Sequence, residues 1–393
     1  MTNPIPIRLP LLMDGEIKAE PDYQQNPDFV KNIKEKYALN GCDIISAPTE
    51  SFNRIKLSSQ DKVSENNSTI VSLTKSVSAS AMTAGVIGPT GEFIEPLGNI
   101  SFSEAIDIFY EQASAQKQAG ADLFIIKNMD YIGEIRAAVI ACNKLDLPVF
   151  VIISVDRFGN TQLDSTALSY LIPLQEMGVS AFGISSDCRL YELSLIIKEL
   201  VRHSKIPIIA IPSPHIIDDD DEYILSPEEF AEETEMLLES GAKIIGGANE
   251  FSPEYCSALK KLMADFEFDK VLIEKEDTSL ILSNAKQVFY LSPDGIEISE
   301  PVICSVDMAD VLLEFSNTNI DVIRVDVITS DDAYQFSQNA YMSNLPVMFH
   351  SDDKSALKLA LLSYHGRAMI DKECGIDYNT LEKIADKYGA VIY

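Results

Sequence analysis

Positive charge is scarce in this sequence. Its 31 lysines and arginines stand against 61 aspartates and glutamates, which gives a formal net charge of -30. The sequence also lacks a cluster of basic residues interleaved with aromatic residues. Because such a surface repels a phosphate backbone, we exclude nucleic acid as a partner.

Paired cysteines are absent as well. The six cysteines lie far apart, and no two of them form a Cys-x-x-Cys motif. This spacing is typical of reduced, buried thiols and argues against a disulfide framework, a zinc knuckle or redox chemistry. The six are Cys42, Cys142, Cys188, Cys256, Cys304 and Cys374.

The N-terminal region has no long apolar run. Residues 1–15 carry one basic residue, Arg8, and a short apolar patch that prolines interrupt, so neither a secretory signal nor a membrane span is expected. We therefore predict a cytoplasmic protein without a membrane partner. Consecutive carboxylates at residues 218–222 are a candidate calcium site, but such runs in loops are more often solvated acidic tips, and we interpret them so.

What the sequence does contain is an alternation of short apolar runs and amphipathic stretches from residue 9 to residue 248. Eight such units predict an α/β protein built on a (β/α)8 TIM barrel. The expected strands are residues 9–15, 42–48, 82–88, 122–128, 148–155, 181–186, 207–213 and 243–248.

Helix start and stop signals agree with these units. Ser101 and Glu104 form a capping-box pair, and Gly120 follows where a glycine ends a helix. Ser226 and Glu229 form a second pair before another helical stretch.

The pattern restarts after about residue 268. We predict a barrel over residues 1–267, a linker over 268–300, and a partial, truncated TIM-barrel-like α/β domain over 301–393. The linker contains two segments that are predicted to be strands, at residues 270–273 and 287–291. Five strands cannot close a barrel, so a sheet edge should stay open and need a cover. The first barrel or a second copy of the chain is favoured over a different protein. The five runs are residues 301–304, 321–327, 346–349, 367–370 and 390–393.

One segment resembles a known family closely. The run Gly-Pro-Thr-Gly at residues 88–91, with residues 95–98 and 103–105, resembles the third-strand region of the homocysteine S-methyltransferase family. The resemblance spans roughly residues 8–265 and implies a homocysteine-binding (β/α)8 barrel. Shorter matches lie at residues 14–15, 41–45, 119–122 and 241–247.

The C-terminal part resembles a second barrel. Residues 345–353, with matches at 360–367 and 387–390, are similar to the pterin-binding (folate) barrel that follows the homocysteine barrel in cobalamin-dependent methionine synthase. The resemblance implies a folate barrel that stops near its fifth strand, without the cobalamin and reactivation modules.

The family resemblance implies a zinc ion that binds homocysteine as a thiolate, held by one cysteine after strand six and two after strand eight. In this chain Ser186, Ala248 and Asn249 stand at those positions. A hydroxyl, a methyl group and a neutral amide do not replace three thiolates. We therefore predict no zinc, no other cofactor and no zinc-dependent methyl transfer.

Most other pocket positions implied by the family have changed too. Lys127-Asn128 replaces Glu-Thr after strand four, and Pro-Ser-Pro-His at residues 212–215 replaces Pro-Asn-Ala-Gly after strand seven. Lys127 would lie at the strand end where such barrels bind ligands, although a lysine there can also reach solvent. No residue is assigned a catalytic role. The candidate substrate-pocket residues are Asp14 and Thr49, which are retained, with Lys127, Ser186, Ser213 and Asn249.

A relocated zinc site is the alternative metal hypothesis. Cys188, His215 and Cys256 could face one end of the barrel, but Cys256 is expected too far along its helix to share a metal with Cys188.

The folate half shows parallel losses. His350-Ser351 replaces Asp-Ser, residues 324–326 read Arg-Val-Asp in place of Asp-Val-Asn, and Asp371-Lys372 replaces Asn-Ser. The resemblance therefore implies that the groups that bind the pterin ring are missing.

Three hypotheses follow. The leading one is a non-catalytic relative of methionine synthase, a binding or assembly module with a small-molecule ligand and a homodimeric or methionine synthase-type partner. The second is an active methyltransferase with an altered substrate or a relocated metal. The third is a sensor of a small thiol, amino acid or folate compound.

Overall fold

The structure is a computed structural model that describes residues 10–15, 27–95, 98–217, 222–276, 280–315 and 318–393. The acidic run considered as a cation site falls mostly outside these residues. The chain forms two compact units. The first comprises residues up to 93, 103–163 and 179–275, and the second comprises 94–102, 164–178 and 276–393.

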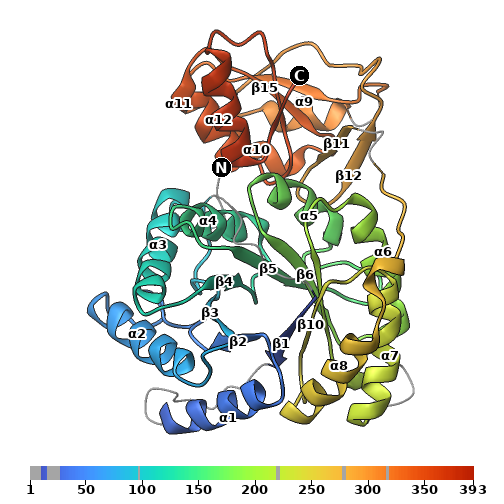
Figure 1. Ribbon diagram of the computed structural model, residues 1–393. Helices are drawn as coiled ribbons and strands as arrows, with labels where there is room; N and C mark the ends of the chain where they lie inside the picture. Colours follow the sequence, from blue (N-terminus) through green and yellow to red (C-terminus); the bar gives the residue numbers. More distant parts are fainter. Residues whose placement is uncertain (1–9, 16–26, 96–97, 218–221, 277–279, 316–317) are drawn as a thin grey trace. The chain divides into compact units, whose positions relative to one another are not determined.

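The first unit contains eight parallel strands in a closed barrel (Figure 1). The strands are β1 (Leu11–Gly15), β2 (Ile44–Ala47), β3 (Met82–Ile87), β4 (Leu123–Ile126), β5 (Val149–Ser154), β6 (Ala181–Ser186), β7 (Ile208–Pro212) and β10 (Ile244–Gly247). Strands consecutive along the chain are neighbours in the sheet, and β10 closes the barrel on β1. This confirms the predicted (β/α)8 barrel, since each expected run contains one strand.

Helices lie outside the barrel strands (Figure 1). They are α1 (Pro27–Leu39), α2 (Asp61–Lys75), α3 (Phe102–Gln118), α4 (Ile132–Asn143), α6 (Leu190–His203), α7 (Pro227–Glu239) and α8 (Pro253–Asp265). The capping box before α7 is confirmed, because the Ser226 side chain accepts from the Glu229 N–H and Glu229 accepts from the Ser226 N–H. Gly120 follows α3 with φ +101, a conformation that favours glycine.

An unexpected hairpin follows β7. It consists of β8 (His215–Ile217) and β9 (Glu222–Ile224), which pair antiparallel.

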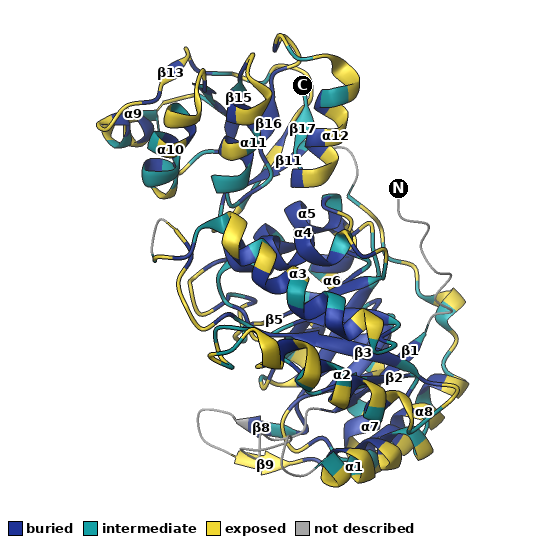
Figure 2. Ribbon diagram, turned by 90° about the vertical axis from the view of Figure 1, so that its left-hand side faces the viewer, coloured by how far each residue is buried: buried dark blue, intermediate teal, exposed yellow. Residues whose placement is uncertain are grey.

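The barrel core follows from strand alternation. Every second residue of a strand points inward, so Leu123 and Ile125 of β4 meet Phe150 and Ile152 of β5 inside the barrel. Figure 2 shows the barrel strands buried and the outer faces of the surrounding helices exposed. At the carboxyl ends of the strands, the same alternation brings polar side chains to the inner side, where a ligand could reach them.

The second unit contains five parallel strands in the order of the sequence. This confirms the five expected runs. The strands are β13 (Val302–Ile303), β14 (Ile323–Asp326), β15 (Val347–His350), β16 (Met369–Ile370) and β17 (Val391–Ile392). The unit also contains α5 (Ala167–Glu176), α9 (Met308–Glu314), α10 (Ser330–Asn339), α11 (Lys354–Ser363) and α12 (Tyr378–Tyr388).

A hairpin of β11 (Leu280–Ser283) and β12 (Val288–Leu291) covers one face of this sheet. Leu282 and Leu291 of the hairpin pack in one buried cluster with Met348 and Met369 of the sheet. The sheet is open, as expected, because among the described residues β13 and β17 each pair on one side only. Ile303 on the β13 edge is 71% exposed.

The prediction of a strand at residues 270–273 is wrong. A short 3-10 helix occupies Phe268–Lys270, and residues 271–276 have no regular structure. Lys275 donates instead to the carbonyl oxygens of Val201 (2.5 Å) and Ser204 (2.8 Å) at the end of α6. The expected strand at 287–291 is confirmed as β12.

None of the helices in the described ranges is long and apolar enough to cross a membrane.

A substitution at Gly366 tests how closely the β11–β12 hairpin packs on the sheet. A Cβ there would lie 1.9 Å from the Ser283 carbonyl oxygen and 2.7 Å from the Asn284 Cα, and neither backbone atom can rotate away. We expect Gly366→Ala to lower the free energy of unfolding of the second unit by about 3 kcal/mol in urea titrations. Gly295→Ala is the control, because its Cβ would meet nothing within 4 Å. The only expected loss of stability in this variant is the backbone strain of an alanine at φ +93, about 1 kcal/mol. Equal losses in the two variants would contradict the packing account.

Candidate functional site at the mouth of the first barrel

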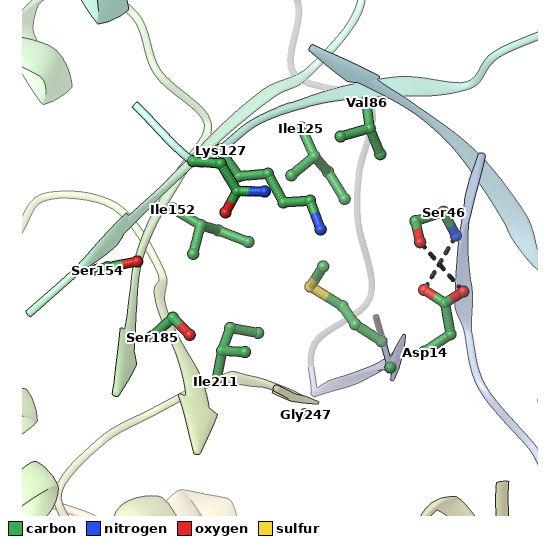
Figure 3. A pocket seen from close by; sticks show the side chains of 13 residues that line it. Asp14, Ser46, Val86, Ile125, Lys127, Ile152, Ser154, Ser185, Ile211 and Gly247 are labelled. Carbon is green, nitrogen blue, oxygen red and sulfur yellow. Dashed lines mark hydrogen bonds between the residues drawn. The ribbon is translucent and has the colours of Figure 1, made fainter. Parts of the chain in front are cut away.

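A cavity opens at the carboxyl ends of the barrel strands, the end at which such barrels bind ligands (Figure 3). Its volume is about 30 Å³, enough for about two water molecules. Apolar side chains form its inner wall, and polar side chains lie around its rim. It is lined by Met13, Asp14, Gly15, Ser46, Val86, Ile125, Lys127, Asn128, Ile152, Ser154, Ser185, Ile211 and Gly247.

Asp14 forms a buried ion pair in this wall. Its Oδ2 lies 2.5 Å from Lys34 Nζ, and both side chains are 1% exposed. The Ser46 N–H donates to Asp14 Oδ1 at 3.0 Å, and the Ser46 hydroxyl donates to Oδ2 at 3.2 Å, as Figure 3 shows. Lys34 also donates to the Ser46 hydroxyl oxygen at 3.1 Å. Both oxygens of Asp14 therefore have partners from the protein.

The helical periodicity of α1 places Lys34 on the buried side of the helix. Val30, Lys34 and Tyr37 are three and four residues apart and form the buried stripe of the helix. Tyr37 lies beneath the Lys34 ammonium group, 5.8 Å from ring centre to Nζ, and donates its hydroxyl proton to the Phe251 carbonyl oxygen at 2.5 Å. Burial, and then the negative charge of Asp14, raise the pKa of Tyr37. The hydroxyl therefore stays a donor and ties α1 to the loop after β10.

Lys127 extends from the end of β4 into the cavity. Figure 3 shows its ammonium group on the inner side, near the apolar side chains of Ile125 and Ile152. The next residue, Asn128, has φ +60, a left-handed conformation that asparagine tolerates better than most residues. Such conformations are enriched at functional sites because the surrounding structure must hold them in place.

The other predicted pocket residues lie outside the cavity lining. Thr49 is fully buried and bonds the β3 backbone: its hydroxyl donates to the Val86 carbonyl oxygen (2.8 Å) and accepts from the Val86 N–H (3.1 Å). Ser213 closes a turn with the backbone of His215. The side chain of Asn249 is exposed.

Two of the three positions at which the family resemblance places cysteines, residues 186 and 248, lie at one level of the barrel. The Ser213 N–H donates to the Ser186 carbonyl oxygen (3.2 Å), and the Ala248 N–H donates to the Pro212 carbonyl oxygen (3.1 Å). Ser186 at the end of β6 and Ala248 after β10 therefore lie on either side of the end of β7, and Asn249 follows Ala248 in the chain. A hydroxyl, a methyl group and an amide do not fit a zinc ion that prefers thiolate or imidazole ligands.

The residues of the relocated zinc hypothesis have separate surroundings. Cys256 is buried, with its sulfur 2.9 Å from the sulfur of Cys42. His215 lies in the β8–β9 hairpin, with Nε2 2.7 Å from Glu222 Oε1. Burial raises the pKa of Cys188. Across the described ranges no group of three or more His, Cys, Asp or Glu side chains is arranged to hold a metal ion.

The Gly-Pro-Thr-Gly motif after β3 has a structural role. The Thr90 N–H and hydroxyl both donate to Glu134 Oε1, at 2.7 and 2.6 Å, which ties the motif to α4. Burial raises the pKa of Glu134, and the bonds from Thr90 act in the opposite direction.

In the second unit, the positions that the resemblance to a pterin-binding barrel singled out form an ion cluster. Arg324 Nε lies 2.8 Å from Asp326 Oδ1, Arg324 Nη1 lies 3.4 Å from Asp371 Oδ2, and His350 Nδ1 lies 2.8 Å from the same oxygen. These side chains bond to one another at neighbouring strand ends.

Eight parallel strands in a closed barrel, with a partly polar cavity at their carboxyl ends, define a (β/α)8 barrel protein. The family model for homocysteine S-methyltransferase matches residues 9–263, more than half of the chain. The chain belongs to this family.

Similar proteins agree with this membership. Methionine synthase from Mycobacterium leprae (strain TN) is 24% identical over 252 residues, which cover 59% of this chain and 21% of the relative. Methionine synthase from Mycobacterium tuberculosis (strain ATCC 25618 / H37Rv) is 23% identical over 264 residues, which cover 62% and 22%. The aligned part of the chain thus spans about a fifth of the length of these relatives.

The fold is similar to that of the homocysteine methyltransferase MmuM from Escherichia coli. The apo form matches with a TM-score of 0.52 and 18% identity, covering 64% of this chain and 95% of MmuM. The metallated form matches with a TM-score of 0.53 and 16% identity, over the same shares of the two chains.

Sequence reasoning missed Lys34, Ser46, Ser154 and Ser185. Lys34 had a signal, because a lysine on an apolar helical stripe needs a buried partner. Ser185 was passed over for its neighbour Ser186, because a motif position does not tell which side of a strand faces the barrel interior.

The ion pair can be tested by removing one charge. Lys34→Met leaves the Asp14 carboxylate buried without its cation, and we expect the free energy of unfolding to fall by about 3–5 kcal/mol. Lys31→Met, on the exposed side of the same helix, should change it by less than about 0.5 kcal/mol. Adding Asp14→Asn to Lys34→Met should restore much of the loss. A loss for Lys34→Met as small as that for Lys31→Met would refute the buried pair.

Glu134 gives a pH-dependent prediction. The pKa of Glu134 in the folded protein lies above the ordinary value of 4.5. The protonated side chain therefore contributes its full stabilisation below pH 4.5, and this contribution is lost as the pH rises through the folded-state pKa. Glu134→Gln keeps an oxygen acceptor for Thr90 without the charge. We expect this variant to gain stability over the wild type as pH rises from about 4 to about 8 in urea unfolding. A stability difference that does not change with pH would be inconsistent with the raised pKa.

Proposed function

We propose that this chain has lost zinc-dependent methyl transfer to homocysteine and acts as a binding or assembly module within its family. The observation that carries the proposal is the donor set at the three family positions. Ser186 and Ala248 stand at one level of the barrel mouth, Asn249 follows Ala248 in the chain, and none of the three offers a thiolate.

The chemical argument rests on the pKa of a thiol. A free thiol has a pKa near 8.5, so only a few per cent is thiolate at neutral pH, and bound zinc supplies the missing ionisation. The hydroxyl of Ser186 stays neutral near pH 7, Ala248 has no donor atom, and the Asn249 amide is a neutral oxygen donor. We derive no methyl-transfer step for this chain.

Other features support binding and assembly. The cavity at the barrel mouth remains, with Asp14 and Lys127 in its lining. In the second unit, the β13 edge is unpaired on one side within the described residues, and Ile303 on it is 71% exposed. Such an edge favours pairing with another surface, and we propose a second copy of the chain or a methionine synthase-type protein as the partner.

A sensor of a small molecule is the second candidate function. It is favoured by the Lys127 ammonium group, which extends into the cavity (Figure 3). The third possibility, an active methyltransferase with an altered substrate or metal, is tested by the metal experiment below.

Metal content and methyl transfer test the proposal together. We expect less than about 0.1 zinc per purified chain and no methylation of homocysteine from methylcobalamin or another methyl donor, because three thiolates are missing. The triple variant Ser186→Cys, Ala248→Cys, Asn249→Cys is the positive control and should bind about one zinc ion. Stoichiometric zinc in the wild type, lost in Cys188→Ser, or turnover of homocysteine would overturn the proposal.

A further inference from the structure

We infer that Cys42 and Cys256 form a modification site, a pair of thiols that an oxidant of the peroxide class joins into a disulfide that stabilises the first barrel. This inference goes beyond the proposed function and does not depend on it.

The first argument is the contact between the two sulfurs. Cys42 precedes β2, and Cys256 lies in α8, 214 residues further along the chain. Their Sγ atoms are 2.9 Å apart, and the S–S bond of a disulfide is about 2.05 Å long. The sulfurs therefore need to approach each other by only about 0.9 Å. The spacing of the cysteines in the sequence does not reveal this pair, because only the closed barrel brings its two members together.

Hydrogen bonds on both sides of the pair hold the two segments in place. The Ser257 hydroxyl of α8 donates to Asn40 Oδ1 at 2.5 Å. Lys260, one turn further along the same helix, donates to both carboxylate oxygens of Asp43, at 2.8 and 3.0 Å. Asn40 and Asp43 flank Cys42, so these bonds anchor the segment around it to α8. The two thiols are therefore held adjacent by contacts that involve neither sulfur.

The reaction with hydrogen peroxide balances without a further reactant. Cys42 is 5% exposed and Cys256 is fully buried, so Cys42 is the thiol that a small oxidant reaches first. Its thiolate attacks one peroxide oxygen, the O–O bond breaks, and a sulfenic acid and one water molecule form. The Cys256 sulfur then attacks the Cys42 sulfur, the S–O bond breaks, and the oxygen leaves as a second water molecule with the Cys256 proton. Two thiols are oxidised to a disulfide while one peroxide is reduced to water.

The surroundings of Cys42 make this reaction slow at neutral pH. The hydrogen bond to Cys256, and then burial, raise the pKa of Cys42 far above its ordinary value. Because the thiolate is the nucleophile, the rate of cross-linking follows the small fraction of thiolate. We expect this rate to rise about tenfold for each pH unit between about pH 7 and about pH 9.

The cross-link closes a loop that contains almost the whole barrel. Every barrel strand except β1 lies between residues 42 and 256. A disulfide removes conformations from the unfolded chain, and it removes more of them when the closed loop is long. We therefore expect the urea midpoint of unfolding to lie about 1 M or more higher in the oxidised chain than in the reduced chain.

A count of free thiols tests the pair directly. The full chain is reduced, separated from the reductant, treated with hydrogen peroxide, and then unfolded in urea with a maleimide. We expect two fewer labelled cysteines than the six of the reduced chain. Before labelling, the mass should be about 2 Da lower, because two thiol protons leave as water. Digestion should give one linked peptide pair that contains residues 42 and 256.

Variants locate the cross-link. Cys42→Ala and Cys256→Ala should each abolish both the linked peptides and the rise in the urea midpoint on oxidation. Cys142→Ala is the matched control, because it removes another fully buried thiol and should keep both. Urea unfolding of the reduced variants establishes that each is folded.

Four results would overturn the inference. They are six labelled cysteines after peroxide treatment, a gain of about 32 Da from a sulfinic acid in place of the loss, a cross-link between another pair, and the same urea midpoint in the oxidised and reduced chains. None of them bears on the proposed loss of methyl transfer, which zinc content and homocysteine turnover test.

Discussion

The barrel mouth depends on the buried ion pair between Asp14 and Lys34. Two charges removed from water are tolerated only when each has a close partner, and here the Nζ–Oδ2 distance is 2.5 Å, with Ser46 bonding both ions. The pair joins α1 to β1, and Ser46 extends the contact to β2. It also occupies both oxygens of Asp14, so the carboxylate retained on the first strand is already bonded within the protein.

In this protein the fold and the chemistry of the site depend on different groups, the backbone for the fold and a few side chains for the chemistry. The backbone hydrogen bonds of parallel strands bring residues 186 and 248 to one level whatever their side chains are. Metal binding depends on those side chains alone, and a serine, an alanine and an asparagine keep the fold without the thiolates. The same holds in the second unit, where Arg324, His350 and Asp371 form ion pairs with neighbouring side chains at the strand ends. Family membership thus establishes ancestry and architecture, and activity has to be argued from the site.

The sequence predicted the strands well because apolar runs, spaced by helical stretches, reflect burial on both sides of a parallel sheet. The site was predicted only in part. Asp14 was identified from the family resemblance, and Lys127 because it follows a barrel strand at the end where such barrels bind ligands. Lys34 was missed because its partner is 20 residues away along the chain and on another element. Ser185 was missed because the sequence does not tell which of two adjacent strand residues, Ser185 or Ser186, faces the barrel interior. The structure was needed to decide this.

The most direct test of this account is a crystal structure of the full chain grown with zinc and homocysteine. The account predicts no zinc ion at Ser186, Ala248 and Asn249, and Lys34 still paired with Asp14. A structure in which Asp14 has left Lys34 to bind the ligand or a metal ion would contradict it.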